Sequence, residues 1–392
     1  MRILEFIFWI SLFIIFYTYL GYGILLYLLV KIKECFHRTV IPEQEGGLPE
    51  VTLFIAAYNE EAVVAEKMNN TLSLDYPKDK LRIMWVTDGS NDRTGELLSA
   101  YPGVDVLHQP QRSGKTAALN RGMAYVHTPI VVFTDANTMI NREALREIVA
   151  CFRDKKVGCV AGEKRIAVQD KDAAAAGGEG IYWKYESCLK SLDSRLYTAV
   201  GAAGGLFAVR RELFEEMEND TLLDDFILSL RIAGKGYKIA YCDAAYAVES
   251  GSADMHEEEK RKVRIAAGGL QSIMRLRYLL NPFRYGMLTF QYVSHRVLRW
   301  SLTPILLFLL FPVNIILALG TGSFIYWLLL VLQCLFYISG LWGYYLSTKS
   351  IKNKFLFIPY YFLFMNVNVI RGFFYLRKKR GTGVWEKAKR NS

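Results

Sequence analysis

The sequence is short of the residues that build zinc sites and disulfide frameworks. Its 392 residues include only 6 cysteines and 5 histidines. No two cysteines have C-x-x-C spacing, and the histidines do not cluster. Because zinc sites and disulfide scaffolds need such groupings, neither is supported, and reduced, mostly buried thiols are expected.

The chain also lacks the glycine-rich motifs that commonly bind nucleotides. The segment 111-QRSGK-115 followed by Thr116 ends like a phosphate-binding loop, but the position five before Gly114 is Gln109 instead of glycine. No G-x-G-x-x-G follows the first apolar run, which excludes a dinucleotide-binding fingerprint. A nucleotide would therefore have to be bound by other groups.

Charge is absent from two long stretches. Residues 6–30 carry none over 25 positions, and residues 300–348 carry none over 49 positions. A helix needs about 20 apolar residues to cross a bilayer, whereas the apolar core of a signal peptide is shorter. The first stretch predicts a transmembrane helix over 4–30. The second, broken by 320-GTGS-323, predicts transmembrane helices over 301–319 and 323–347.

A shorter apolar run follows near the carboxyl terminus. Only 16 uncharged residues precede Arg371, and they include Pro359, Asn366 and Asn368. Such a run is short for a span, and buried asparagines are costly in hydrocarbon. The segment 355–376 is predicted to be transmembrane or re-entrant. We expect a re-entrant path, which would return the basic tail 377–392 to the side of the large domain.

The net charge of +10 raises the question of a nucleic-acid partner. Much of the excess lies beside the apolar runs, at Lys31, Lys33, Lys349 and 377-RKKR-380. Basic flanks of this kind orient membrane proteins with the positive side in the cytoplasm. The sequence therefore predicts a multi-pass protein of the cytoplasmic (inner) membrane, in contact with membrane lipid, with a cytoplasmic catalytic domain and no nucleic-acid partner.

Between the membrane regions, apolar runs alternate with helical patterns. Four such pairs predict an α/β fold with a mostly parallel sheet covered by helices. The strand runs are 51–58, 82–90, 104–109 and 130–136, and the helical patterns are 61–74, 94–100, 115–126 and 142–152. This assigns a linker to 31–49, the large domain to 50–280 and an amphipathic interface segment to 281–300.

Each apolar strand run turns polar at its carboxyl end, where open α/β sheets bind ligands. The run 130-IVVFTDAN-137 ends in Asp135 and Asn137, and the earlier runs end near Glu60 and Asp88. A single acid at a strand end is more often a solvated loop carboxylate or a helix cap. Polar groups at four consecutive strand ends instead indicate a site for a nucleotide diphosphate with a hard divalent cation.

Five segments in this order resemble the motifs of family-2 glycosyltransferases, particularly membrane-embedded cellulose, chitin, hyaluronan and poly-N-acetylglucosamine synthases. They are AYNE at 57–60, VTDGSNDRT at 86–94, HQPQRSGKTAALN at 108–120, FTDAN at 133–137 and LLDDFILSLRIAGKGYKIAY at 222–241. The resemblance implies a GT-A fold, a nucleotide-diphosphate sugar donor such as a UDP-sugar, Mg²⁺ or Mn²⁺, and inversion at the anomeric carbon.

The resemblance also implies roles for single residues on the donor side. Asp88 would meet the uridine, with Tyr58 and Glu60 lining the same pocket. Asp135 would hold the metal, and Asn137 stands where the family has a second aspartate. Lys115 and Arg264 match the cations that neutralise the diphosphate. Two departures from the processive members lie beside Arg264, where Arg261 replaces Gln and Ile265 replaces the Trp on which an acceptor sugar stacks.

On the acceptor side, Asp225 matches the base that deprotonates the acceptor hydroxyl, a step that a poorly nucleophilic hydroxyl requires. Gly204, Gly205 and Asp224 match acceptor-side positions. Helix capping is the alternative role for Asp224 and Asp225. The resulting function is hexosyl transfer to a growing polysaccharide or glycan, with single-sugar transfer to a lipid-linked acceptor as the alternative. A membrane scaffold without chemistry is a third possibility, against which intact Asp88, Asp135 and Asp225 argue.

Overall fold

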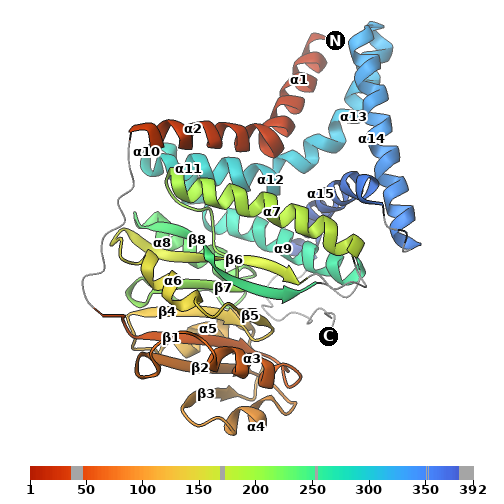
Figure 1. Cartoon of the computed structure of the whole chain (residues 1–392). Coiled ribbons are helices and arrows are strands. Elements are labelled where there is room, and N and C mark those ends of the chain that lie inside the picture. Colours follow the sequence, from red (N-terminus) through yellow and green to blue (C-terminus); the bar gives the residue numbers. More distant parts are fainter. Residues whose placement is uncertain (37–46, 168–172, 252–254, 350, 352, 379–392) are drawn as a thin grey trace.

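A computed structural model describes residues 1–36, 47–167, 173–251, 255–349, 351 and 353–378. An α/β domain lies below a layer of helices, and α1, α13 and α14 rise above that layer (Figure 1). Most of the expected linker 31–49 and of the basic tail 377–392 falls outside the described residues.

The domain is built on one eight-stranded sheet of order β3-β2-β1-β4-β7-β6-β8-β5. The first four of these pair in parallel, and β7 runs antiparallel to β4. The strands are β1 Val51–Ala57, β2 Leu81–Asp88, β3 Val104–Gln109, β4 Ile130–Asp135, β5 Thr138–Ile140, β6 Val157–Ala167, β7 Leu206–Arg210 and β8 Lys238–Ser250. The α/β fold class and the parallel arrangement of the first four strands are confirmed, and the whole sheet is mixed.

Helices cover both faces of the sheet because the central strands are apolar on both sides. In β1 the first five residues are buried, and they alternate between the two faces. One core packs α3 Val64–Leu72, α4 Thr94–Ser99 and α6 Ala144–Cys151 on one face. The other core packs α5 Lys115–Met123 and α8 Asp224–Gly234. Asp224 and Asp225 are thus the first two residues of α8. The sequence predicts instead that they precede a helix beginning at Phe226.

The antiparallel pairing of β7 with β4 brings the acceptor-side glycines to the metal-side strand end. Thr134 is paired with Leu206, so the residues just before β7 lie next to the end of β4. Gly201, at the start of this loop, has φ +86°, and a Cβ there would lie 2.2 Å from Phe226. Only glycine fits this backbone and this contact.

The expected transmembrane helix over 4–30 bends in its middle. Helix α1 Arg2–Phe16 ends in a π-helical turn, Tyr17–Gly21, and α2 Tyr22–Phe36 then turns aside and runs across the domain (Figure 1). Tyr22, Leu26 and Val30 of α2 are buried against α7 Ala173–Leu196. The second half of the apolar segment, α2, therefore packs on α7. By length and composition the whole segment is apolar enough to cross a membrane, and crossing stays a prediction.

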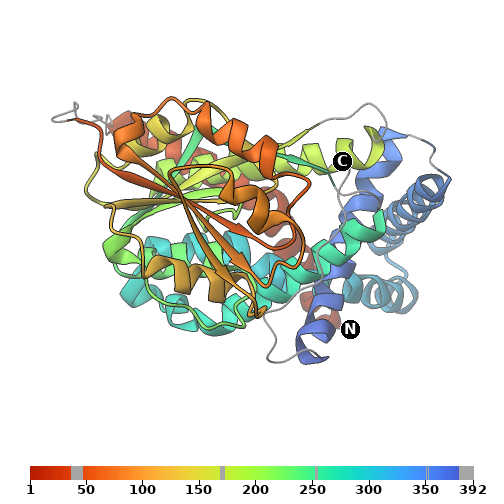
Figure 2. The ribbon, with the colours of Figure 1, turned by 90° about the horizontal axis from the view of Figure 1, so that it is seen from below.

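Three further helices are long and apolar enough to span a membrane: α13 Leu302–Thr321, α14 Phe324–Thr348 and α15 Lys354–Lys378. Seen from below, the carboxyl-terminal helices lie to one side of the sheet (Figure 2). α15 contacts both α14 and the soluble domain: a Cβ on Gly343 would lie 2.9 Å from Tyr360, and a Cβ on Gly372 would lie 2.7 Å from Ala266 of α9 Met255–Arg275. The re-entrant path of this segment in a membrane stays a prediction.

The segment 281–300 forms short helices above the domain. It contains α10 Pro282–Tyr285, α11 Met287–Tyr292, a π-helical turn Val293–Val297 and α12 Leu298–Trp300, and it follows α9 and the 3₁₀ turn Arg277–Leu280. Two of its arginines do not face water, since Arg296 and Arg299 are 7% and 8% exposed, whereas Arg284 is exposed. Both pair with Glu186 of α7, so the polar face of this segment is turned toward the protein.

Candidate active site

Hydrogen bonds join the loop that follows β1 to the loop that follows β2. Asn59, with φ +51°, donates from its backbone N–H to Ser90 Oγ at 3.1 Å and from its amide to Asn91 at 2.8 Å. The Glu60 N–H donates to Thr94 Oγ1 at 2.9 Å. Tyr58 and Glu60 are therefore held on a loop fixed to the neighbouring strand end, as expected for the nucleoside side of the site.

Asp88 is 4% exposed, and its carboxylate accepts hydrogen bonds from the backbone N–H groups of Ser113 and Gly114, at 2.7 to 3.1 Å. Gly114 has φ +98° and starts α5, so Asp88 sets where Lys115 begins its helix. On the same loop, the guanidinium of Arg112 lies 3.7 Å from the ring centroid of Tyr58. Asp88 thus positions the 111–115 loop, a role that the resemblance did not imply, and its contact with the uridine stays a prediction.

Lys115 connects two of the predicted acids, Asp135 and Asp224. Its Nζ lies 2.8 Å from Asp135 Oδ1 and 3.7 Å from Asp224 Oδ2. Burial opposes its charge, but Asp135 and Asp224 outweigh burial and raise the pKa of Lys115. A lysine that stays charged between two carboxylates can neutralise an incoming diphosphate.

The turn after β4 carries Asp135 and Asn137 and is held from below by a buried lysine. Lys67 of α3 donates to the Thr138 carbonyl at 2.6 Å and to Thr134 Oγ1 at 3.1 Å. Burial lowers the pKa of Lys67 to about 7. The Oδ1 atom of Asn137 is buried and has no hydrogen-bond partner. An unsatisfied buried oxygen is costly unless a ligand meets it.

Asp135 and Asn137 fit a hard divalent cation as oxygen donors. A magnesium-type ion is commonly held by one or two protein oxygens together with substrate phosphates and water. A carboxylate and the unpartnered carbonyl oxygen of Asn137 supply such donors. Among the described residues no cluster of three or more histidines, cysteines or acids forms a complete metal site, so this pair would depend on the substrate for further ligands.

Asp225 faces a cavity of about 260 Å³ together with Lys115, Asp135, Gly204 and Gly205. Burial and the neighbouring Asp224 raise its pKa to about 6, against the opposing charge of Lys115. The loop that carries the glycines is fixed to the metal-side turn, since Thr134 Oγ1 donates to the Gly205 carbonyl at 3.0 Å. A carboxylate with a raised pKa at a cavity wall is suited to accept a proton.

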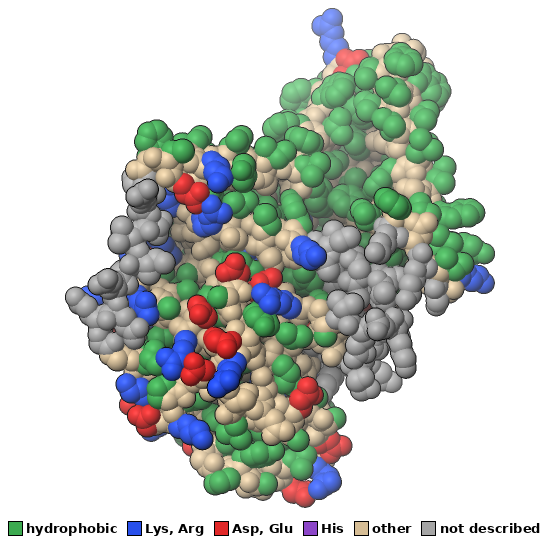
Figure 3. All heavy atoms as spheres, viewed as in Figure 1, with side chains coloured by type: hydrophobic (Ala, Val, Ile, Leu, Met, Phe, Trp, Pro, Cys, Tyr) green, Lys and Arg blue, Asp and Glu red, His purple; other side chains and the backbone are tan. Residues whose placement is uncertain are grey.

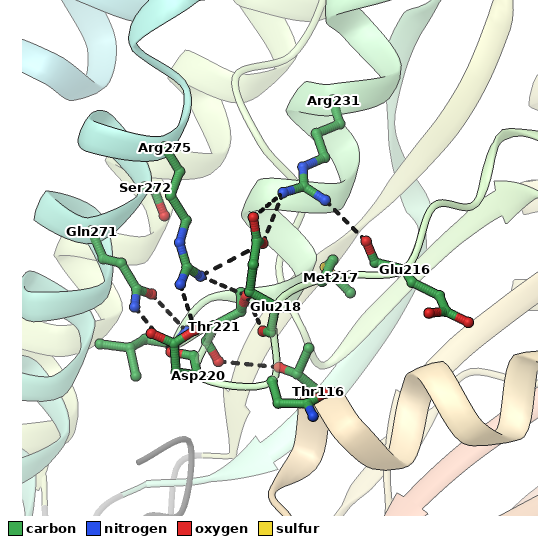
Figure 4. A network of polar contacts seen from close by, with 12 residues as sticks. Thr116, Glu216, Met217, Glu218, Asp220, Thr221, Arg231, Gln271, Ser272 and Arg275 are labelled. Carbon is green, nitrogen blue, oxygen red and sulfur yellow. Dashed lines mark hydrogen bonds and ion pairs between the residues drawn. The ribbon is translucent and has the colours of Figure 1, made fainter. Parts of the chain in front are cut away.

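A polar network anchors the segment that leads into Asp224 and Asp225 (Figure 4). Arg275 of α9 donates to Asp220 Oδ1 at 2.5 Å and to Thr221 Oγ1 at 2.7 Å. Gln271 accepts from the Leu222 N–H at 3.0 Å, and Thr116 of α5 donates to the Thr221 carbonyl at 3.1 Å. The start of α8 is therefore tied to both the donor-side helix α5 and the long helix α9.

Helix α9 and the helices α7, α12 and α15 close the cavity. Arg264 lines it, as do Arg261 and Ile265, the two positions that depart from processive relatives. Glu186 of α7 and Arg296 also line the cavity. Burial opposes the negative charge of Glu186, but Arg296 and His295 hold the pKa of Glu186 well below its usual range. The cavity is thus formed between the α/β domain and residues of α7, α12 and α15.

The structure brings most of the predicted site residues to this cavity and leaves the others outside it. Seven of the predicted residues line it: Lys115, Asp135, Gly204, Gly205, Asp224, Asp225 and Arg264. Tyr58, Glu60, Asp88 and Asn137 belong to the adjoining loops described above. Sequence reasoning missed Lys67, Glu186 and Arg296, which only packing brings to the site.

Residues 52–218 match the family model of Glycosyl transferase family 2. The chain carries a family 2 glycosyltransferase domain. The resemblance to this family is thereby confirmed. The match extends from β1 through β7 and contains the first four motifs, but it ends before the fifth, 222–241, which carries Asp224 and Asp225.

Curated relatives of this domain are named for different products. The chain is 31% identical over 206 residues to beta-monoglucosyldiacylglycerol synthase of Trichormus variabilis, and the aligned region covers 48% of this chain and 42% of the relative. It is 27% identical over 247 residues to poly-beta-1,6-N-acetyl-D-glucosamine synthase of Staphylococcus aureus, and that aligned region covers 60% of this chain and 57% of the relative. The chain therefore spans about half the length of these relatives.

Among solved structures, the chain resembles mannosyltransferase PcManGT from Pyrobaculum calidifontis in complex with GDP-Man and Mn²⁺. The TM-score is 0.70 at 20% identity, over 96% of this chain and 100% of the other. At this identity the likeness shows the fold alone, and it confirms the GT-A fold class.

Proposed function

We propose that the chain transfers a sugar from a nucleotide-diphosphate sugar to an acceptor hydroxyl at the membrane, with inversion. One observation carries this proposal: Asp225, with its pKa raised to about 6, shares a cavity wall with the Lys115 and Asp135 pair. A proton acceptor and a diphosphate-binding group at one cavity are what a single displacement at the anomeric carbon requires.

On the donor side, Lys115 and Arg264 bind the diphosphate, and Tyr58, Glu60 and Asp88 form the nucleoside side. Asp135 and Asn137 hold a divalent cation, Mg²⁺ or Mn²⁺. When bound, this ion neutralises charge that develops on the diphosphate leaving group. The Lys115 ammonium supplies part of the same neutralisation from the protein itself, because Asp135 holds it at the cavity wall.

On the acceptor side, Asp225 accepts the proton of the attacking hydroxyl. One of its oxygens, Oδ1, already accepts the Phe226 N–H at 2.8 Å, which orients the carboxylate and leaves Oδ2 toward Gly204. Gly204 and Gly205 present no side chain there, so an acceptor can approach the backbone. Asp224 stays close to Lys115 and keeps the pKa of Asp225 raised.

The acceptor is a growing glycan or a lipid-borne group. The relatives compared above include one named for a glucosyl diacylglycerol and one named for a polysaccharide. Ile265 stands where processive members have the stacking tryptophan, and this favours single-sugar transfer.

The catalytic domain is proposed to face the cytoplasm from a multi-pass position in the cytoplasmic membrane. Four candidate spans flank the domain, and basic residues follow α2 and α14. A cytoplasm-dependent reporter fused after Ser392 tests whether the tail returns to this side, because a silent reporter on an active fusion would place the tail outside.

A panel of nucleotide sugars tests the reaction. The purified full chain in detergent is offered each donor with Mg²⁺ or Mn²⁺, and released nucleotide diphosphate is measured. Release from one donor class, lost in Asp225→Asn, supports the proposal. No release from any donor, with or without membrane lipid, would contradict it.

A further inference from the structure

A second, apolar cavity lies on the membrane side of the catalytic one. Its volume is about 500 Å³, and it is enclosed by α1, the π-helical turn that follows it, α7, α12 and α15. Its lining is mostly hydrocarbon, from residues such as Ile15, Leu20, Ile358, Phe362 and Met365. Cavities of this size and character bind apolar ligands.

The two cavities adjoin each other. Trp300, Met365 and Val369 line both. The Trp300 ring also packs edge-on against Phe226, the neighbour of Asp225, with centroids 5.0 Å apart. A molecule that lies in the apolar cavity and extends past Trp300 would reach the wall that carries Asp225.

The outer edge of the apolar cavity is exposed at the level of the candidate spans. Leu20 and Ile358 line it and are 58% and 52% exposed, and both belong to segments apolar enough to cross a membrane. The apolar surface seen around α13 and α14 in Figure 3 marks the same end of the molecule. A lipid chain could enter from this side without crossing water.

The polar side chains in the lining make hydrogen bonds within the protein. Arg299 donates to Glu186 at 3.0 Å and Tyr361 donates to Glu258 at 3.2 Å, both outside the lining. Tyr19 Oη donates to Asn366 Oδ1 at 2.5 Å, Asn366 Nδ2 donates to the Phe362 carbonyl at 2.9 Å, and Tyr185 Oη donates to the Tyr19 carbonyl at 2.6 Å. A glycan in this cavity would bury hydroxyl groups against hydrocarbon, which is costly, whereas an acyl or isoprenoid chain would not.

We propose that this cavity holds the hydrocarbon chain of a lipid acceptor whose hydroxyl or phosphate head enters the catalytic cavity past Trp300. The inference rests on the proposed glycosyl transfer and selects its acceptor class. A diacylglycerol and a polyprenyl phosphate share this chemistry, so both are tested. A structural membrane lipid and a water-soluble glycan are the competing occupants.

The first experiment compares acceptors. The full chain in phosphatidylcholine vesicles receives its donor with dioleoylglycerol, a polyprenyl phosphate or a water-soluble oligosaccharide, and glycosylated product and nucleotide release are measured. Transfer to either lipid supports the inference, and the productive one identifies the head group. Transfer to the oligosaccharide alone overturns it while the proposed function stands. No nucleotide release with any acceptor overturns both.

The second experiment obstructs the cavity with matched variants. Leu20→Trp and Ile358→Trp narrow it, and Ile24→Trp and Ile351→Trp are controls that are 57% and 53% exposed and do not line it. Each lost methylene contact weakens apolar binding about fourfold, so the apparent KM for the lipid should rise about 10- to 50-fold in the cavity variants only. Donor hydrolysis without acceptor should equal that of the controls, which shows that the variants are folded.

A photoreactive probe separates an acceptor from a structural lipid. A diazirine placed in the chain of the productive lipid should label peptides that contain residues 15–20 or 358–366, and unlabelled acceptor should reduce this labelling. Equal KM values in cavity and control variants, or labelling that excess acceptor does not displace, would overturn the proposal.

Discussion

Gly204 faces Asp225 so closely that a Cβ on residue 204 would lie 3.3 Å from Asp225 Oδ2 and 3.4 Å from Lys115 Nζ. The backbone at Gly204 is not in the left-handed region, so space alone sets the requirement here. A methyl group at this point would push the carboxylate or the ammonium by a few tenths of an ångström.

Gly204→Ala should therefore lower kcat/KM for transfer, by about 10- to 100-fold, because small misplacements of reacting groups are costly. Gly95→Ala is the control, since Gly95 lies outside the cavity and a Cβ there would meet nothing within 4 Å. Steady-state kinetics on both variants checks this. Equal effects of the two substitutions would show that Gly204 has no special relationship with Asp225.

The pH dependence of transfer should follow the ionisation of Asp225. Its pKa is raised to about 6, and the base acts only when unprotonated, so kcat/KM should fall about tenfold per pH unit below pH 6. Asp224→Asn removes a negative neighbour, so the acidic limb should move to lower pH. A profile that is flat down to pH 4.5 would exclude Asp225 as the base.

Metal-dependent nucleotide binding should require Asp135. Asp135→Ala removes a carboxylate ligand of the ion, and titration calorimetry should show that added Mn²⁺ no longer strengthens binding of a nucleotide diphosphate. Asn137→Ala removes a neutral donor and should weaken the effect less. Full transfer activity in excess chelator would refute the metal site altogether.

Lys67 should matter for the site although it lies beneath it. Lys67→Met keeps the apolar stem but leaves the Thr138 carbonyl without its donor, which should cost about 1–3 kcal/mol of stability. Nucleotide binding with metal should weaken as the 134–138 turn loosens. Lys80→Met, which removes a half-exposed donor to the Leu48 carbonyl, is the control for thermal melting and binding. Unchanged binding in a less stable Lys67→Met would limit Lys67 to folding.

The parts of the fold that follow local patterns could be predicted from the sequence. The run 130–133 is apolar on both faces, so it had to be a buried strand, and its polar end had to reach the ligand edge of the sheet. The strands β6 and β8 were not predicted. In β8, buried and exposed positions do not alternate regularly, and a register shift interrupts its pairing with β6.

The missed site residues depend on packing between distant elements. Lys67 lies on the same helical face as the buried Val64, Met68 and Thr71, and this spacing was the one local sign that it faces inward. Glu186 and Arg296 are 110 positions apart and come together only because α7 packs beneath the 281–300 segment. The hydrogen bonds from backbone N–H groups to Asp88 likewise depend on the positive φ of Gly114. The pattern of apolar and polar residues in the sequence does not reveal this backbone conformation.

The most direct test of the account is a comparison of Asp225→Asn with Asp224→Asn in the same two assays. With Asp225 as the base, Asp225→Asn should lower transfer by about 10²–10⁴-fold, the usual loss for a missing general base, while the Kd of the nucleotide diphosphate stays unchanged. Asp224→Asn should retain most of the activity. Near-normal turnover in Asp225→Asn, or a larger loss in Asp224→Asn, would contradict the assignment of Asp225 as the base.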